Sequence, residues 1–247
     1  MRVLSLFSGI GGIDLGLEWA GMQVTGQIEI DEYCQTILEK NFPKAKRWRD
    51  ITSVTAHDIR RHCGAVELIC GGFPCQDISV AGKGRGASEG EKSGLWREMW
   101  RIIGVLRPAW LLIENVPALR LRGADSVLSA LEAIGYTCWP VVVGAWAVGA
   151  PHKRDRVWIV AHANSEPVRK RGVLTGLVSR NQRQAPSIAF PACQRSEQRE
   201  WELARSKPAM GSTADGIPSG LALKAIGNSV VPQIPYLIGK WIMQAHE

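Results

Sequence analysis

The strongest constraint on the fold is an alternation of short apolar runs with helical stretches along the first two-thirds of the chain. Residues 2–7 (RVLSLF) predict a buried strand, and residues 12–21 predict a helix that ends at Gly21. The same order of strand and helix returns at 23–30 and 31–42. Strands that alternate with helices are typical of a sheet covered by helices on both faces. The sequence therefore predicts an α/β fold with a doubly wound, Rossmann-like sheet.

The alternation continues to Ala163. Further strands and helices are expected at 66–73, 93–108, 109–115 and 126–135. Residues 136–150 and 156–163 resemble two strands joined by the turn 151–155, which predicts an antiparallel edge of the sheet. A last helix is expected after Pro232.

The composition changes after Ala163. Residues 164–217 are rich in Arg, Gln, Ser, Gly and Pro, and they carry nine basic against five acidic residues. A disordered, solvated linker is one interpretation of such a stretch, and a small region that recognises a target is the other. We expect a catalytic and cofactor-binding domain at 1–163, a small, irregular target-recognition region at 164–217, and a C-terminal segment at 218–247 that returns to the catalytic domain.

Charge and cysteine usage restrict the class of protein. The formal net charge of +7 favours an anionic partner such as nucleic acid. The six cysteines show no C-x-x-C spacing and no grouping with histidines, so neither a metal site nor a disulfide framework is predicted. The N-terminal apolar stretch is short and glycine-broken, unlike a signal peptide, and no apolar run is long enough to span a bilayer. These features predict a soluble, cytoplasmic protein.

Three glycines, Gly9, Gly11 and Gly12, lie between the first strand and the first helix. Glycines at this position allow a ligand to approach the free N–H groups of the helix N-terminus. Glu29 ends the second strand, where an acidic side chain accepts hydrogen bonds from ribose hydroxyls. Asp14 in the first helical turn disfavours pyrophosphate, so a sulfonium cofactor without phosphate suits the turn better than a dinucleotide. A purely structural turn is the alternative.

The stretch 71–79 (GGFPCQDIS) places Cys75 on a turn directly after a buried strand. A structural cysteine is more at home inside a strand, so a cysteine displayed behind Pro74 suggests a nucleophile. The long glycine-rich stretch 76–94 carries basic residues and suggests a lid that closes on a polyanion. Glu114 ends the next strand, so a thiol nucleophile and a carboxyl proton donor are expected in one cleft.

Five short motifs occur in the order FSGIGG, PCQ, ENV, HKRDR and GNSV. Together they resemble the motif series of the DNA (cytosine-5)-methyltransferases, in particular the short bacterial and phage type, over nearly all of the chain outside 164–217. The resemblance implies methyl transfer from S-adenosyl-L-methionine to carbon 5 of a cytosine flipped out of double-stranded DNA. It also implies a place in restriction and modification, in a bacterial cell or a phage-infected host. We expect a monomer.

The resemblance implies roles for individual residues. The Cys75 thiolate adds to carbon 6 of cytosine and Glu114 holds or protonates ring nitrogen 3, so that carbon 5 becomes nucleophilic. Arg154 and Arg156 lie beside the flipped base, although His152 stands where the family often has glutamine. Without the resemblance, two arginines on a turn are typical of a solvated surface. Cofactor contacts are implied for Phe7, Gly9, Gly11, Glu29, Asp50, Ile51, Pro74, Leu95, Asn228 and Val230.

Four alternatives accompany these expectations. Asp50 is expected to accept from an adenine amino group, or else to cap a turn. RNA is an alternative substrate, yet PCQ lacks the Cys-Phe-Thr extension of the RNA-modifying relatives. A catalytically inactive DNA-binding module is disfavoured by the intact Cys75 and Glu114. A nicotinamide-dependent oxidoreductase explains the glycine turn but leaves PCQ and ENV unexplained.

Overall fold

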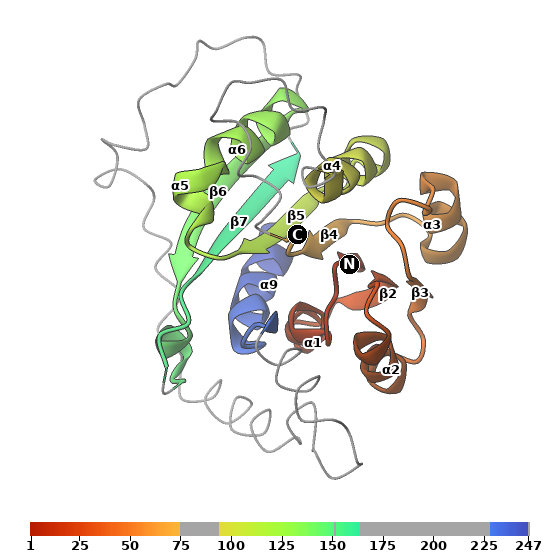
Figure 1. The fold of residues 1–247 in the computed structure, drawn as a ribbon, viewed down its shortest axis with the longest axis horizontal. Helices are drawn as coiled ribbons and strands as arrows, with labels where there is room; N and C mark the ends of the chain where they lie inside the picture. The colour runs from red at the N-terminus through yellow and green to blue at the C-terminus, as the bar shows by residue number, and fades with distance from the viewer. Residues whose placement is uncertain (75–93, 151, 164–227, 247) are drawn as a thin grey trace.

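The computed structural model describes residues 1–74, 94–150, 152–163 and 228–246. In this part of the chain a seven-stranded sheet has the strand order β3-β2-β1-β4-β5-β7-β6 (Figure 1). Strands β3, β2, β1, β4 and β5 are parallel to one another, and β7 is antiparallel to both β5 and β6. The strands are β1 (Arg2–Leu6), β2 (Gln23–Ile28), β3 (Lys46–Trp48), β4 (Leu68–Gly71), β5 (Trp110–Asn115), β6 (Tyr136–Val143) and β7 (Arg156–Ala163). The predicted doubly wound α/β fold is confirmed.

Helices cover both faces of this sheet (Figure 1). Helices α3, α4 and α6 pack with the sheet in one core cluster, whereas α1, α2 and α9 pack with it in the other. Their bounds are α1 (Gly12–Trp19), α2 (Glu32–Asn41), α3 (Ala56–Cys63), α4 (Gly94–Leu106), α5 (Leu119–Arg122), α6 (Ala124–Ala133) and α9 (Gln233–His246), with a short 3₁₀ helix η3 (Ala145–Val148).

The central strands are buried on both faces, which explains their unbroken apolar sequences. In β4, Leu68 and Cys70 belong to the cluster on the α1 face, whereas Ile69 belongs to the cluster on the α4 face. Strand β5 divides its side chains in the same way, with Leu112 on the first face and Ile113 on the second. Successive side chains of a strand point to opposite faces, so Leu68 to Cys70 and Trp110 to Ile113 are apolar throughout, and polar residues enter β5 only at its end, with Glu114 and Asn115.

The sequence prediction differs from the structure in some of its smaller elements, among them α5, which was not expected. The expected strand 136–150 ends at Val143, and η3 takes up the following residues. Helix α3 was not expected, although a capping box marks its start: Thr55 accepts from the Asp58 backbone, and Asp58 accepts from the Thr55 backbone. The predicted antiparallel edge is present, with β6 outermost and β7 inserted next to β5.

The C-terminal helix α9 packs against α1 (Figure 1). Gly16 of α1 permits this contact, because a Cβ atom there would collide with the Pro232 carbonyl oxygen and would lie 2.7 Å from Pro235. The packing brings Val230 to the start of α1. Within the described ranges no helix has the length and apolarity to cross a membrane.

Candidate active site

The turn between β1 and α1 has a left-handed backbone at three of its residues. Phe7, Gly9 and Gly11 have φ angles of 55°, 54° and 84°. Gly11 is required by packing as well, because a Cβ atom there would lie 2.6 Å from the Phe42 ring. A Cβ atom on Gly9, in contrast, would meet no atom within 4 Å. The turn is therefore packed against the protein at Gly11 and open at Gly9.

Glu29, at the end of β2, is tied to this turn. Its Oε2 accepts a hydrogen bond from the Gly9 N–H at 2.7 Å, and its Oε1 accepts one from the Asp31 N–H at 2.9 Å. The sequence predicted Glu29 as a ribose acceptor and did not foresee these two backbone contacts. A carboxylate oxygen has two lone pairs, so each oxygen keeps capacity for a further donor.

Asp50 and Ile51 follow β3 on the same edge of the sheet. Asp50 is exposed and accepts hydrogen bonds from the Thr52 N–H and hydroxyl at 2.9 and 2.7 Å. These bonds lower the pKa of Asp50, and they match the turn-capping alternative. Ile51 is buried and Leu95 of α4 is partly buried in the same core cluster.

Asp14 lies below the turn rather than on its surface. It is fully buried and accepts hydrogen bonds from Ser5 at 2.8 Å and from Gln27 at 2.9 Å. Burial raises the pKa of Asp14 to about 6 against the effect of these bonds. Its side chain connects α1 with β1 and β2, which the sequence did not predict.

The C-terminal segment reaches the turn from the other side. Val230 is buried, and its carbonyl oxygen would lie 3.0 Å from a Cβ atom on Gly12. Asn228 and Pro74 are exposed. Seven of the predicted cofactor residues follow the carboxyl ends of β1 to β4, where open α/β sheets bind ligands: Phe7, Gly9, Gly11, Glu29, Asp50, Ile51 and Pro74. Carboxylates, backbone N–H groups and apolar side chains at one sheet edge fit an adenosine-type ligand.

Glu114, at the end of β5, forms an ion pair inside the protein. Its Oε1 lies 2.9 Å from Arg156 Nε, and the two side chains are only 14% and 17% exposed. Burial raises the pKa of Glu114 to about 7, against the opposing charges of Arg156 and Arg154. Both protonation states of this carboxyl group are therefore accessible near neutral pH.

The residues around Glu114 hold it close to the turn that leads to Cys75. Gly72 leaves room for the carboxyl group, because a Cβ atom there would lie 2.6 Å from Glu114 Oε2. Buried Asn115 donates a hydrogen bond from Nδ2 to the Phe73 carbonyl at 2.9 Å. The ENV motif contains Asn115, for which no role was predicted; the structure ties it to the backbone two residues before Cys75.

Arg154 takes a different position from Arg156. Its guanidinium donates a hydrogen bond to the Ser229 carbonyl oxygen, and its backbone φ is 38°. His152 is exposed. Cys75, the stretch 76–93 and the region 164–217 lie outside the described residues. Among the described residues, no group of His, Cys, Asp or Glu could hold a metal ion.

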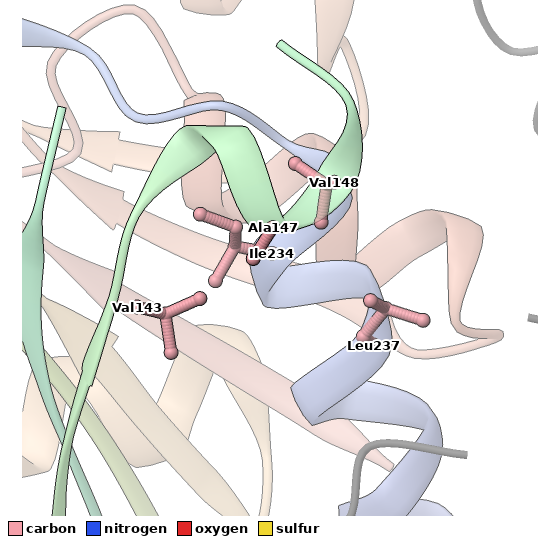
Figure 2. Close-up of a pocket in the computed structure, with 5 residues that line it drawn as sticks. All are labelled: Val143, Ala147, Val148, Ile234 and Leu237. Atoms are coloured by element: carbon pink, nitrogen blue, oxygen red, sulfur yellow. The ribbon is translucent and has the colours of Figure 1, made fainter. Parts of the chain in front are cut away.

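An apolar pocket lies apart from these residues, where β6 and η3 meet α9 (Figure 2). Its lining is aliphatic: Val143, Ala147, Val148, Ile234 and Leu237. None of these side chains can pair with the hydroxyl or amino groups of an adenosine. This pocket is therefore unsuited to the predicted cofactor.

Comparison with known proteins was made on both sequence and structure. The Type II methyltransferase M2.BsuMI of Bacillus subtilis is 39% identical over 175 residues, which cover 68% of this chain and 43% of that protein. The Type II methyltransferase M.NgoBI of Neisseria gonorrhoeae is 30% identical over 244 residues, covering 92% of this chain and 75% of that protein. The chain spans about half the length of several curated relatives that it matches.

Two solved structures share the fold. A Dnmt2 methyltransferase of S. pombe has a TM-score of 0.70 at 18% identity, and all of each chain is covered. A structure described as a prophage-encoded DNA modification methyltransferase of E. coli has a TM-score of 0.56 at 28% identity, covering 66% of this chain and 47% of that one. The sequence model for "C-5 cytosine-specific DNA methylase" matches residues 1–214. With most of its length matched, the chain belongs to the C-5 cytosine-specific DNA methylase family.

Proposed function

We propose that the protein methylates carbon 5 of cytosine in double-stranded DNA. The observation that carries this proposal is the buried Glu114–Arg156 pair beside the turn that leads to Cys75. S-adenosyl-L-methionine, held at the glycine turn, supplies an electrophilic methyl group when it is bound. The proposal is supported by the sheet edge at the ends of β1 to β4, which carries residues expected at the cofactor, among them Gly9, Gly11, Glu29 and Asp50.

Carbon 5 of cytosine is a weak nucleophile until a group adds across the ring. The Cys75 thiolate forms a bond to carbon 6, and the electron pair of the 5,6 double bond moves towards ring nitrogen 3. Glu114, with a pKa of about 7, donates a proton or a hydrogen bond to that nitrogen. Carbon 5 would then take the methyl group from the sulfonium sulfur of the bound cofactor, whose carbon–sulfur bond breaks to leave S-adenosylhomocysteine. Loss of the carbon 5 proton and release of the thiolate restore the double bond and free the enzyme.

Arg156 holds Glu114 in place for this chemistry, and Asn115 sets the backbone ahead of Cys75. The reacting ring must lie between the two side chains, so the cytosine has to leave the DNA stack. We further propose that the protein acts as a monomer in the cytoplasm of a bacterial cell or phage-infected host. A role in restriction and modification follows the names of its relatives, which are Type II methyltransferases.

A covalent trap tests the chemistry. DNA that carries 5-fluorocytosine at target sites should form a stable adduct on Cys75, because fluorine cannot leave as a proton does. Mass spectrometry should locate the DNA on Cys75, and Cys75→Ser should abolish both the adduct and methyl transfer while S-adenosylhomocysteine still binds. An adduct on another cysteine, or wild-type turnover in the serine variant, would refute the mechanism. RNA of the same sequence, tested in parallel, decides between the two nucleic acids.

Residues 164–217 are proposed as the region that selects the DNA sequence, between a catalytic domain at 1–163 and a returning segment at 218–247. Their Arg and Gln side chains are of the kinds that hydrogen-bond guanine and adenine edges. An alanine scan should cover Arg180, Gln182, Arg183, Gln184, Arg195, Gln198 and Arg199. Loss of a base contact should relax one position of the methylated site by roughly 1–3 kcal/mol. If no variant changes the preferred site in a randomised library, recognition lies elsewhere, and the stretch 76–94 is next to be scanned.

A further inference from the structure

Arg154 joins parts of the site that lie far apart in the sequence. Its guanidinium donates to the carbonyl oxygen of Ser229, a residue 75 positions further along the chain. The backbone φ of 38° lies in the left-handed region, which is uncommon and strained for a residue with a side chain. The surrounding contacts must hold this conformation against that strain. The position of the guanidinium is therefore determined by the folded structure rather than by local preference.

Ser229, which accepts the hydrogen bond from Arg154, lies beside the glycine turn, the residues 7–12 between β1 and α1. Gly12 has no side chain, and a Cβ atom there would press on Ser229 Oγ and lie 3.0 Å from the Val230 carbonyl oxygen. The Ser229 side chain and the Val230 carbonyl group therefore lie directly against the first turn of α1.

Arg154 also acts on Glu114, through its charge. The positive charges of both Arg156 and Arg154 favour the ionised form of this carboxyl group, and Arg156 also forms the ion pair. Gly72, directly after β4, faces the carboxyl group with no titratable side chain. Within the described residues, Arg154 and Arg156 are thus the charged groups that act on Glu114.

We infer that Arg154 is a positioning residue that couples the glycine turn to Glu114 through the backbone of Ser229. The identity of the ligand at the turn rests on the proposed function. A ligand that holds residues 229 and 230 on the turn also fixes Arg154, and a fixed cation favours ionised Glu114. Coupling between two binding events is reciprocal, so ionisation of Glu114 strengthens binding of the ligand. Arg156 holds the Glu114 carboxylate in place, whereas Arg154 couples the ionisation of that carboxylate to ligand binding at the glycine turn.

Calorimetric titration with S-adenosylhomocysteine between pH 5.5 and 8.5 tests the coupling in the full chain. Wild-type affinity should rise by about fivefold over this range relative to Glu114→Gln, at the low end of typical coupling factors. Arg154→Gln should show the pH dependence of Glu114→Gln, and Arg61→Gln, which removes an exposed arginine of α3, should follow the wild type. Asp14 also titrates near pH 6, but it is present in every variant and cancels in the comparison. A wild-type pH dependence in Arg154→Gln overturns the inference, as does equal behaviour of wild type and Glu114→Gln.

Hydrogen exchange of the unliganded protein tests the link without any cofactor. Arg154→Gln should raise amide exchange in peptides that cover residues 229–236, and the control Arg61→Gln should leave it unchanged. Arg154→Lys keeps the charge beside Glu114 and serves if the glutamine variant does not fold; it should raise exchange in the same peptides. Unchanged exchange in the Arg154 variants refutes the link. Failure of S-adenosylhomocysteine to bind the wild type counts against the proposed cofactor instead, and exchange then decides the link alone.

Discussion

Replacement of Glu114 by glutamine should change the pH dependence of stability in a defined direction. Glu114 is buried, and its pKa is raised from an ordinary value of 4.5 to about 7. Between these values the folded protein holds a proton that the unfolded chain releases. The wild type therefore loses free energy of unfolding as the pH rises from 4.5 through 7, and this contribution is absent from Glu114→Gln.

The size of the effect follows from the two pKa values. At about 1.4 kcal/mol per pH unit, the difference between 4.5 and about 7 corresponds to about 3 kcal/mol. We expect the free energy of unfolding of Glu114→Gln, relative to wild type, to increase by about this amount between pH 4.5 and pH 8. Asp14 has a raised pKa as well, but it is present in both proteins and drops out of the difference.

Urea unfolding of both proteins at pH steps from 4.5 to 8.5 measures this difference. Glu67→Gln is a control of opposite sign, because the Arg2 N–H donates to Glu67 at 2.7 Å and lowers its pKa. The stability that ionised Glu67 contributes is present above pH 4.5 and is lost as the pH falls below it. Glu67→Gln should therefore be less stable than wild type at high pH, and the difference should shrink as the pH falls. A flat difference curve for Glu114→Gln, or one that falls with pH, would show that the ion pair with Arg156 outweighs burial.

Two further substitutions test how Glu114 and the turn before Cys75 are held. Gly72→Ala places a Cβ atom 2.6 Å from Glu114 Oε2. Methyl transfer should therefore fall by about tenfold or more, while S-adenosylhomocysteine binding is kept. The control is Gly104→Ala, where a Cβ atom meets nothing within 4 Å, and it should retain full activity in the same assay. Asn115→Ala removes the hydrogen bond to the Phe73 carbonyl and should lower the free energy of unfolding by about 1–3 kcal/mol. It should also lower the rate of adduct formation on 5-fluorocytosine DNA. A free energy of unfolding within about 0.5 kcal/mol of wild type, with an unchanged rate, would contradict the positioning role.

Local patterns in the sequence were sufficient for the architecture. The apolar runs at 66–73 and 109–115 predicted strands, and these are β4 and β5. The glycines at 9–12 predicted the strand-to-helix turn, whose backbone is left-handed at Gly9 and Gly11. Such features are set by neighbouring residues, through side-chain periodicity and allowed backbone angles. The motif series likewise predicted the family, which the comparisons confirm.

The arrangement of the site was decided by contacts between distant residues. Nothing local to Glu29 indicates that it accepts from Gly9, or that Asp14 is turned inward to Ser5 and Gln27. The insertion of β7 between β5 and β6 places Arg156 against Glu114, and the raised pKa of that carboxyl group is a consequence of burial. Burial and long-range pairing depend on how whole strands and helices pack, so they exist only in the tertiary structure. The sequence determined which residues are present for the chemistry, whereas the packing determined their partners and their protonation.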